Sequence, residues 1–190
     1  MQKGRLNLKK GDTRAAAHAF AEAARQSGDL EQPDLLGAQA HALSLSGDRK
    51  GARTLLVGME QRKQLRPLDR FNLGVAYVEE PGKTARAVEL LEEAEAELSG
   101  GPRLDAALAL AHARNGGLDE ASSKLEGLSD DAVADDDVAK ELLKRARRSL
   151  RQARDAEEKG NAGRKAKKSP RNQSATADQS GSGRGSSKKD

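Results

Sequence analysis

A short pattern occurs four times along the first two thirds of this chain. Each copy has a glycine, a small residue five places later and a large apolar residue four places beyond that. The glycines lie 36, 35 and 34 residues apart, and a fixed period in this range indicates a helical repeat fold. Chains of this architecture usually bind other proteins and carry out no chemistry. The copies are Gly11/Ala16/Phe20, Gly47/Ala52/Leu56, Gly82/Ala87/Leu91 and Gly116/Ala121/Leu125.

The second copy shows why the pattern predicts a pair of helices. Apolar residues recur at helical spacing across residues 33–45, which indicates a first helix. Gly47 suits the left-handed backbone that ends a helix, and Asp48 suits the cap of the next one. In the second helix Ala52 allows the first helix to approach closely, and Leu56 fills the space one turn later.

The copies also align in the predicted helix that precedes each glycine. In each of these helices a small residue is followed, three places later, by a larger one. The clearest pieces are Leu73-Gly74-x-x-Tyr77 and Gly11-Asp12-x-x-x-Ala16-x-x-x-Phe20-x-x-Ala23. This arrangement resembles the tetratricopeptide repeat (TPR) family over about residues 1–128. The resemblance implies an all-α fold, a right-handed helical solenoid of about four antiparallel helix pairs with the first pair truncated. The aligned pairs are Gly4/Asn7, Ala40/Leu43, Gly74/Tyr77 and Ala109/His112.

The rest of the chain divides into a final helix within residues 129–159 and a basic tail. Three acidic residues from Asp135 suit the start of this helix, whose one face is apolar and whose other face is basic. Such a helix suits a cap over the last repeat. The alternative is a basic amphipathic helix that contacts nucleic acid or an anionic membrane. The apolar stripe consists of Val138, Leu142, Leu143, Ala146 and Leu150.

The tail, residues 160–190, has eight Lys and Arg residues against two Asp and almost nothing apolar. It can bury too little surface to offset its ordering entropy, so we predict that it is disordered. A solubilising role is favoured over nucleic-acid binding because no aromatic side chain is present to stack on bases. Net charge is −6 for residues 1–139, +4 for 140–159 and +6 for 160–190. Possible contacts to phosphate groups are Arg164, Lys165, Lys167 and Lys168.

Several classes of function are disfavoured by what the sequence lacks. There is no cysteine, hence no disulfide or thiolate metal site, and no apolar run of about 20 residues. The first residues lack the apolar core of a signal peptide, so a cytoplasmic location is expected. No catalytic, metal-binding or phosphate-loop motif occurs, and we expect no enzyme activity, metal, cofactor or small-molecule ligand. Of the histidines, His41 is expected to face the groove described next, His18 solvent, and His112 the packed interior.

In the TPR family the first helices of the pairs line a concave groove in which ligand segments lie. The resemblance implies a partner-binding groove on the same helices here. Some members grip a chaperone carboxylate with a lysine–asparagine clamp, but only Asn72 and Arg103 suit that pattern, so chaperone binding is disfavoured. The expected binding residues are His41, Leu68, Phe71, Asn72, Val75, Val78, Arg103, Leu110 and Arg114, with Arg5, Lys9, Asp34, Gly37, Ser44 and Ala107 in the same register.

Phe71, Val75 and Val78 are the most distinctive of these residues. They lie at i, i+4 and i+7 and form an apolar stripe beside the signature residues Leu73 and Tyr77. A cluster of large apolar side chains on an exposed face is typical of an interaction site. The alternative is that the superhelix or the final helix covers the stripe.

The sequence therefore predicts a non-catalytic adaptor that docks a helix or an extended peptide of another protein in its groove. Two alternatives stay open. In the first, the chain is the end part of a longer repeat protein that serves in assembly, which would also explain the short first repeat. In the second, it is an accessory protein that contacts nucleic acid or a membrane surface through residues 140–190.

Overall fold

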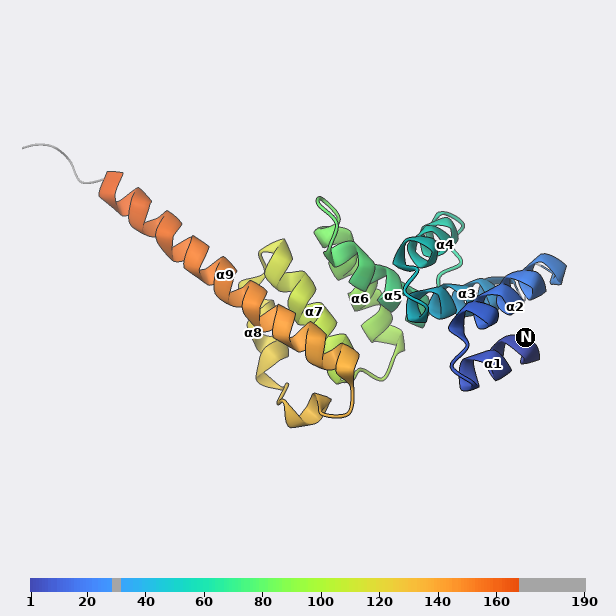
Figure 1. The fold of residues 1–190 in the computed structure, drawn as a ribbon. Coiled ribbons are helices and arrows are strands. Elements are labelled where there is room, and N and C mark those ends of the chain that lie inside the picture. Colours follow the sequence, from blue (N-terminus) through green and yellow to red (C-terminus); the bar gives the residue numbers. More distant parts are fainter. Residues whose placement is uncertain (29–31, 168–190) are drawn as a thin grey trace, which may run out of the picture. The chain divides into compact units, whose positions relative to one another are not determined.

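A computed structural model describes residues 1–28 and 32–167, and in this part of the chain all regular structure is helical (Figure 1). One compact unit ends at Ala156, and all the packing reported below belongs to it; a second unit begins at Glu157. The helices are α1 (Gln2–Lys9), α2 (Thr13–Gln26), α3 (Gln32–Leu45), α4 (Arg49–Gln61), α5 (Pro67–Val78), α6 (Thr84–Glu97), α7 (Pro102–Asn115), α8 (Leu118–Glu126), the 3-10 turn η1 (Asp131–Val133) and α9 (Asp137–Lys167).

The four repeat glycines all lie in the turn between two helices and have a left-handed backbone. Their φ angles lie between +75° and +90°, a region that residues other than glycine rarely adopt. This confirms the prediction that the repeat glycine supplies the left-handed backbone at the end of a helix. In the first two turns the next residue caps the following helix. Asp12 accepts a hydrogen bond from the backbone N of Ala15 at 3.0 Å, and Asp48 from that of Gly51 at 2.8 Å. The turns before α6 and α8 have no such side-chain cap.

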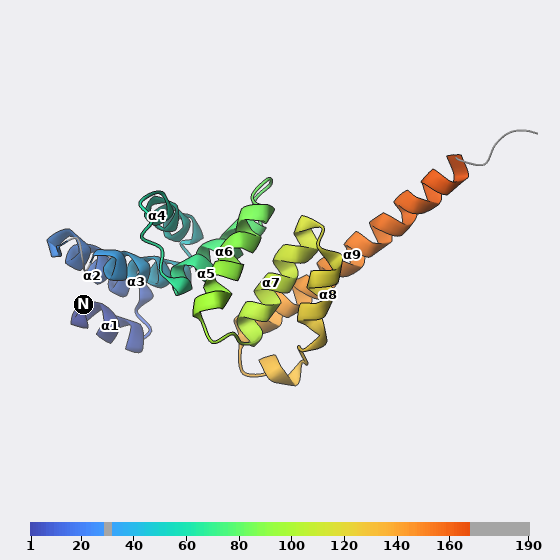
Figure 2. The same ribbon diagram turned by 180° about the vertical axis from the view of Figure 1, so that it is seen from behind.

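Helices that follow one another in the chain pack against each other from α1 to α8, and α5 also packs against α7 (Figures 1 and 2). The small repeat residues explain how closely they approach. A Cβ atom built on Gly4 would lie 2.6 Å from the ring of Phe20, and one on Gly74 would lie 2.7 Å from Cγ of Leu91. Glycine at these positions lets α1 rest on α2 and α5 on α6 without a clash.

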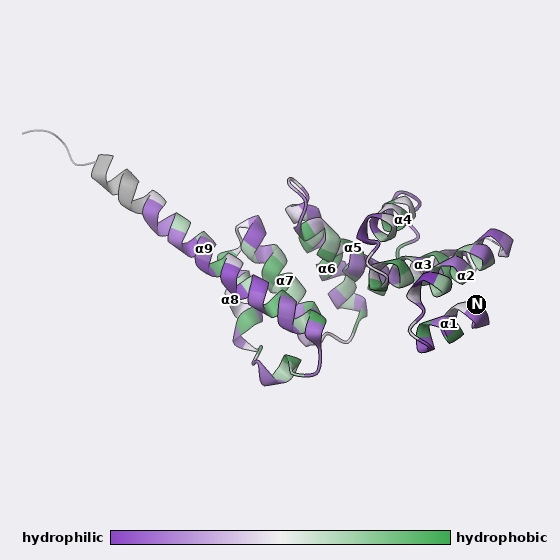
Figure 3. Ribbon diagram, in the orientation of Figure 1, coloured by the Kyte–Doolittle hydropathy of each residue, from purple (hydrophilic) through white to green (hydrophobic). Residues whose placement is uncertain are grey.

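The buried apolar side chains fall mainly into two clusters. The first, here the N-terminal cluster, joins α2 and α3 through four alanines together with Phe20 and Leu35. The second, the main cluster, extends from α3 to α9 and contains most of the buried leucines. Figure 3 shows how hydrophobic and hydrophilic residues are distributed along these helices.

The final helix joins the main cluster, although its apolar face differs from the predicted stripe by one residue. Leu142, Leu143 and Ala146 are buried in that cluster as predicted. Val138 is 52% exposed, and the neighbouring Ala139 is buried instead. A second correction concerns length: α9 continues to Lys167, so residues 160–167 are helical where disorder was predicted. Their Ala, Lys and Arg residues are strong helix formers, which offsets the two glycines. The remaining tail, residues 168–190, lies outside the described part of the chain.

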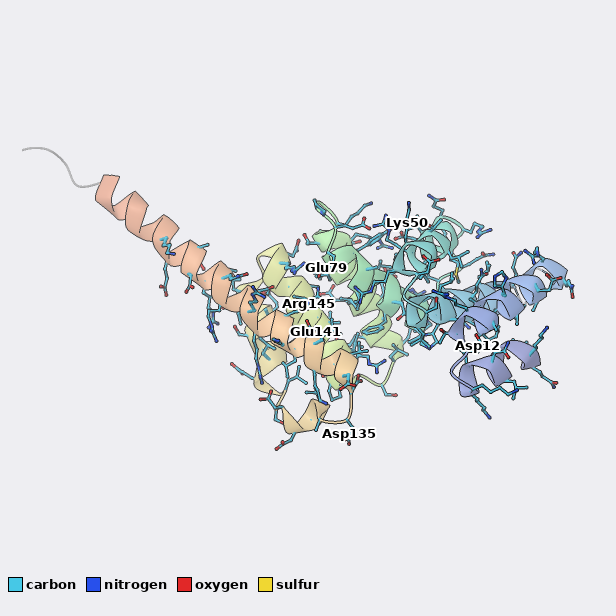
Figure 4. The ribbon with its side chains drawn as sticks, viewed as in Figure 1. Asp12, Lys50, Glu79, Asp135, Glu141 and Arg145 are labelled. Atoms are coloured by element: carbon cyan, nitrogen blue, oxygen red, sulfur yellow. The ribbon has the colours of Figure 1, made fainter. Side chains whose placement is uncertain are left out.

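Ionic contacts tie α9 and the segment before it to earlier helices. Asp136 accepts a hydrogen bond from Nε of Arg103 at 2.7 Å and caps the start of α9 through the backbone N of Val138 and of Ala139. The guanidinium of Arg103 holds the pKa of the Asp136 carboxyl below its usual value. Further along, Arg145 of α9 pairs with Glu79 at the end of α5, both labelled in Figure 4.

Candidate functional site

A cavity of about 280 Å³, here the N-terminal pocket, lies against three alternate helices, α1, α3 and α5. These are the helices that precede a repeat glycine, so the pocket lies on the face on which the sequence placed a groove. Helix α2 contributes only Phe20. The pocket is lined by Met1, Arg5, Phe20, Asp34, Gly37, Ala38, His41, Arg66, Leu68, Asp69 and Asn72.

An ionic cluster forms one wall of this pocket. The carboxylate of Asp69 is only 1% exposed and accepts a hydrogen bond from Nε of Arg66 at 2.8 Å. Nη1 of the same guanidinium donates to Oδ1 of Asp34 on α3 at 2.6 Å. These two carboxylates raise the pKa of Arg66 further above its usual value, with the hydrogen bond to Asp69 the largest favourable cause. Arg66 therefore stays charged and links α3 to the start of α5.

Gly37 makes room for this cluster. A Cβ atom at that position would overlap Nη2 of Arg66 and lie 2.5 Å from Oδ1 of Asp69. Sequence reasoning placed Gly37 and Asp34 on this face but missed both Arg66 and Asp69. A local signal was present, because an acid two places after the helix-starting Pro67 is a typical capping residue, and Oδ2 of Asp69 accepts from the backbone N of Arg66 at 3.3 Å.

The remaining wall combines an apolar side chain with polar ones. Leu68 borders the pocket and is 51% exposed. His41 is exposed on α3, and Asn72 is half-buried one turn after Leu68. A carboxamide both donates and accepts hydrogen bonds, as a peptide group does. The wall thus offers an apolar contact beside groups that can pair with a peptide backbone.

The structure brings together only part of the predicted groove. His41, Leu68 and Asn72 line the N-terminal pocket, as do Arg5, Asp34 and Gly37 from the same register. Lys9 and Ser44 are exposed but are not among its lining residues. Val75 is half-buried and packs against the main cluster.

Four residues expected to face an open groove are instead buried, which corrects their placement there. Phe71 and Val78 belong to the main cluster, as does Leu110, which is 1% exposed. Ala107 is fully buried as well. The physical reason is that α7 packs against α5, and η1 packs against α7, so this part of the face is covered from within the chain.

Two arginines predicted for the groove have internal partners. Arg103 pairs with Asp136, as described above. Arg114 donates from Nη1 to the backbone O of Val78 at 3.1 Å and pairs with Glu79 at 3.0 Å. Their guanidinium groups therefore fasten α7 to its neighbours. Of the possible phosphate contacts, Arg164, Lys165 and Lys167 lie on α9, and Lys168 falls outside the described residues.

The other histidines have separate surroundings. His18 is exposed on α2, and Nε2 of His112 lies 3.7 Å from Oε1 of Glu92. Across residues 1–28 and 32–167 no three His, Asp or Glu side chains gather in a way that could hold a metal ion. None of the helices in the same residues combines the length and the apolar character needed to cross a membrane.

Comparison with known proteins adds no family assignment: neither a protein-family model nor a curated protein matches this sequence. The TPR resemblance therefore rests on the sequence repeat and on the residues that carry it.

Proposed function

We propose that this protein is a non-catalytic adaptor of TPR type, a right-handed solenoid of helix pairs that binds a peptide segment of another protein in the N-terminal pocket. The observation that carries the proposal is the pocket itself. It is formed by successive first helices of the pairs, which is the surface that ligands use in the resembled family. A site that crosses several helices suits an elongated ligand better than a compact one.

The chemistry of the pocket supports a peptide. Leu68 would receive an apolar side chain of the ligand, because covering it removes apolar surface from water. Asn72 would pair with a backbone N–H and C=O, and Arg5 would attract a carboxylate. The ion pairs of Arg66 with Asp34 and Asp69 would hold that wall of the pocket in place before the ligand arrives, which lowers the ordering cost of binding.

The test first selects peptide ligands and then changes two residues that line the pocket. Peptides from a random displayed library are selected on the full chain, and their affinities are measured by fluorescence polarisation. Leu68→Ser combined with Asn72→Ala should weaken the selected peptides at least tenfold, or about 1.4 kcal/mol. The matched control is Leu45→Ser, since Leu45 is 56% exposed on α3 yet does not line the pocket.

The control should leave affinity unchanged. Equal affinity of the pocket variant and the parent, with both variants folded by circular dichroism, would contradict the proposal, because it would place the peptide elsewhere.

A further inference from the structure

A second and larger cavity, here the C-terminal cleft, lies between the η1 segment and the first half of α9 and has a volume of about 920 Å³. It shares no residue with the N-terminal pocket and plays no part in the function proposed above. Two of its lining residues, Val133 of η1 and Leu143 of α9, are only 2% exposed each, whereas the neighbouring Ala134 is exposed.

The α9 wall of the cleft carries exposed positive charge. Lys144, Arg148 and Arg151 follow one another at i, i+4 and i+7, so they share one face of the helix. All three are exposed, and none forms an ion pair with a carboxylate in the described part of the chain. By contrast, Arg147 between them pairs with Asp130 at 2.6 Å and donates to the backbone O of Leu128 at 3.1 Å.

Arg147 gives the cleft its shape. By holding both Leu128 and Asp130, its guanidinium fastens the segment before η1 to the side of α9. The opposite wall is thereby built from this segment and bears Asp130 and Asp131. The cleft therefore has one cationic wall and one wall with carboxylates.

We propose that the C-terminal cleft is a docking site for an amphipathic acidic segment of a partner protein. Its carboxylates would meet Lys144, Arg148 and Arg151, and its apolar side chains would lie over Ala134 at the rim and over the aliphatic stems of these cations. Charge complementarity with the three exposed cations determines this choice of occupant.

Two other occupants fit less well. A nucleic-acid strand carries phosphates on every residue, so it would also face Asp130 and Asp131, and none of the described residues that line the cleft is aromatic. The chain's own residues 168–190 contain five Lys and Arg against two Asp, so their charge repels the cationic wall.

The test uses the full chain and a fluorescein-labelled synthetic peptide with Glu on one face of a helix and Leu on the other. The cleft variant is Lys144→Glu/Arg148→Glu/Arg151→Glu. The control is Lys10→Glu/Lys50→Glu/Lys63→Glu, which changes net charge equally at exposed lysines outside the cleft. The cleft variant should bind the peptide at least tenfold more weakly than the control variant, and a peptide with Leu replaced by Ser should bind the parent weakly.

A substitution that blocks the cleft without changing charge separates the possible occupants. Ala134 is exposed at the rim, so Ala134→Gln should leave folding intact and weaken the Glu/Leu peptide. Single-stranded oligonucleotide and phosphatidylserine vesicles are measured in parallel. Equal peptide affinity of the cleft and control variants would overturn the proposal. The proposal would also be overturned if the oligonucleotide or the vesicles bound more strongly than the peptide and Ala134→Gln left the binding of the oligonucleotide or the vesicles unchanged.

Discussion

Tyr77 is the only tyrosine of the chain, and there is no tryptophan, so a single buried residue can be followed by absorbance. Its hydroxyl donates to Oε2 of Glu60 at 2.8 Å, and Nε of Arg86 donates to Oε1 of the same carboxylate, also at 2.8 Å. Burial, and next the hydrogen bond to Glu60, raise the pKa of Tyr77 to about 12. The repeat residue of α5 is thus linked to α4 and α6 by one shared carboxylate.

The raised pKa predicts how stability responds to alkali. A folded pKa above the unfolded value of about 10 stabilises the native state fully below pH 10. That contribution is lost as pH rises from about 10 toward 12. Tyrosinate absorbance of the folded chain should therefore rise with a midpoint near 12, and Tyr77→Phe should show a smaller loss of stability over that range than the parent. A midpoint near 10 in the folded chain would contradict the packing described for this residue.

At the scale of a helix pair, Ala87 marks the close crossing of α5 and α6. It is fully buried, and a Cβ atom on Gly74 would lie 3.3 Å from its carbonyl oxygen. Ala87→Leu should destabilise the chain by about 1–3 kcal/mol, because added methylene groups have no space there. Ala52→Leu should act likewise at the crossing of the second pair.

The control for this prediction lies in the same helix. Ala85 is exposed, so Ala85→Leu should change the free energy of unfolding by less than about 0.5 kcal/mol. Urea unfolding followed by circular dichroism measures both variants. If Ala85→Leu and Ala87→Leu proved equally stable, the helix register would be wrong.

Much of the element-level structure was predictable because it is local. A glycine and an acid in sequence specify a helix end and a cap, and the structure has both at Gly47 and Asp48. The covering of Phe71, Val78 and Leu110 was not predictable from one helix, since it depends on α7 and on the chain after it. The pattern of a single helix left open whether the stripe was exposed or covered, and the contacts of α5 with α4, α6 and α7 decide this.

The candidate site was predictable in position and only partly in composition. Register placed His41, Leu68 and Asn72 on a shared face, and they line one pocket. The half-buried Arg66 and the buried Asp69 were missed because charged residues beside a proline are equally consistent with an exposed helix start. Only the neighbouring α3, which supplies Asp34, turns that start into an ionic cluster.

At the scale of the whole molecule, the two ends of α9 have different importance for stability. The buried Leu142, Leu143, Ala146 and Leu150 lie in its first half, and burying each leucine contributes about 1.5–3 kcal/mol. A chain that ends at Lys159 should keep the helical signal and melting temperature of the parent, apart from the few helical residues removed. A chain that ends at Asp136 should melt well below it or aggregate, which thermal circular dichroism would show. Equal melting of the two shortened chains would mean that α9 does not complete the core.

The separation of the N-terminal cluster from the main cluster has a consequence for local opening. A cluster built largely of alanines buries little surface per residue, so α1 and α2 should open more often than the rest of the described unit, and their amide hydrogens should exchange with solvent first. The N-terminal pocket is lined by Phe20 from the first cluster and by residues of α5, whose buried apolar side chains belong to the second. A bound ligand would therefore hold the two together, and its clearest signature would be slower exchange in α2, a helix that contributes a single side chain to the pocket.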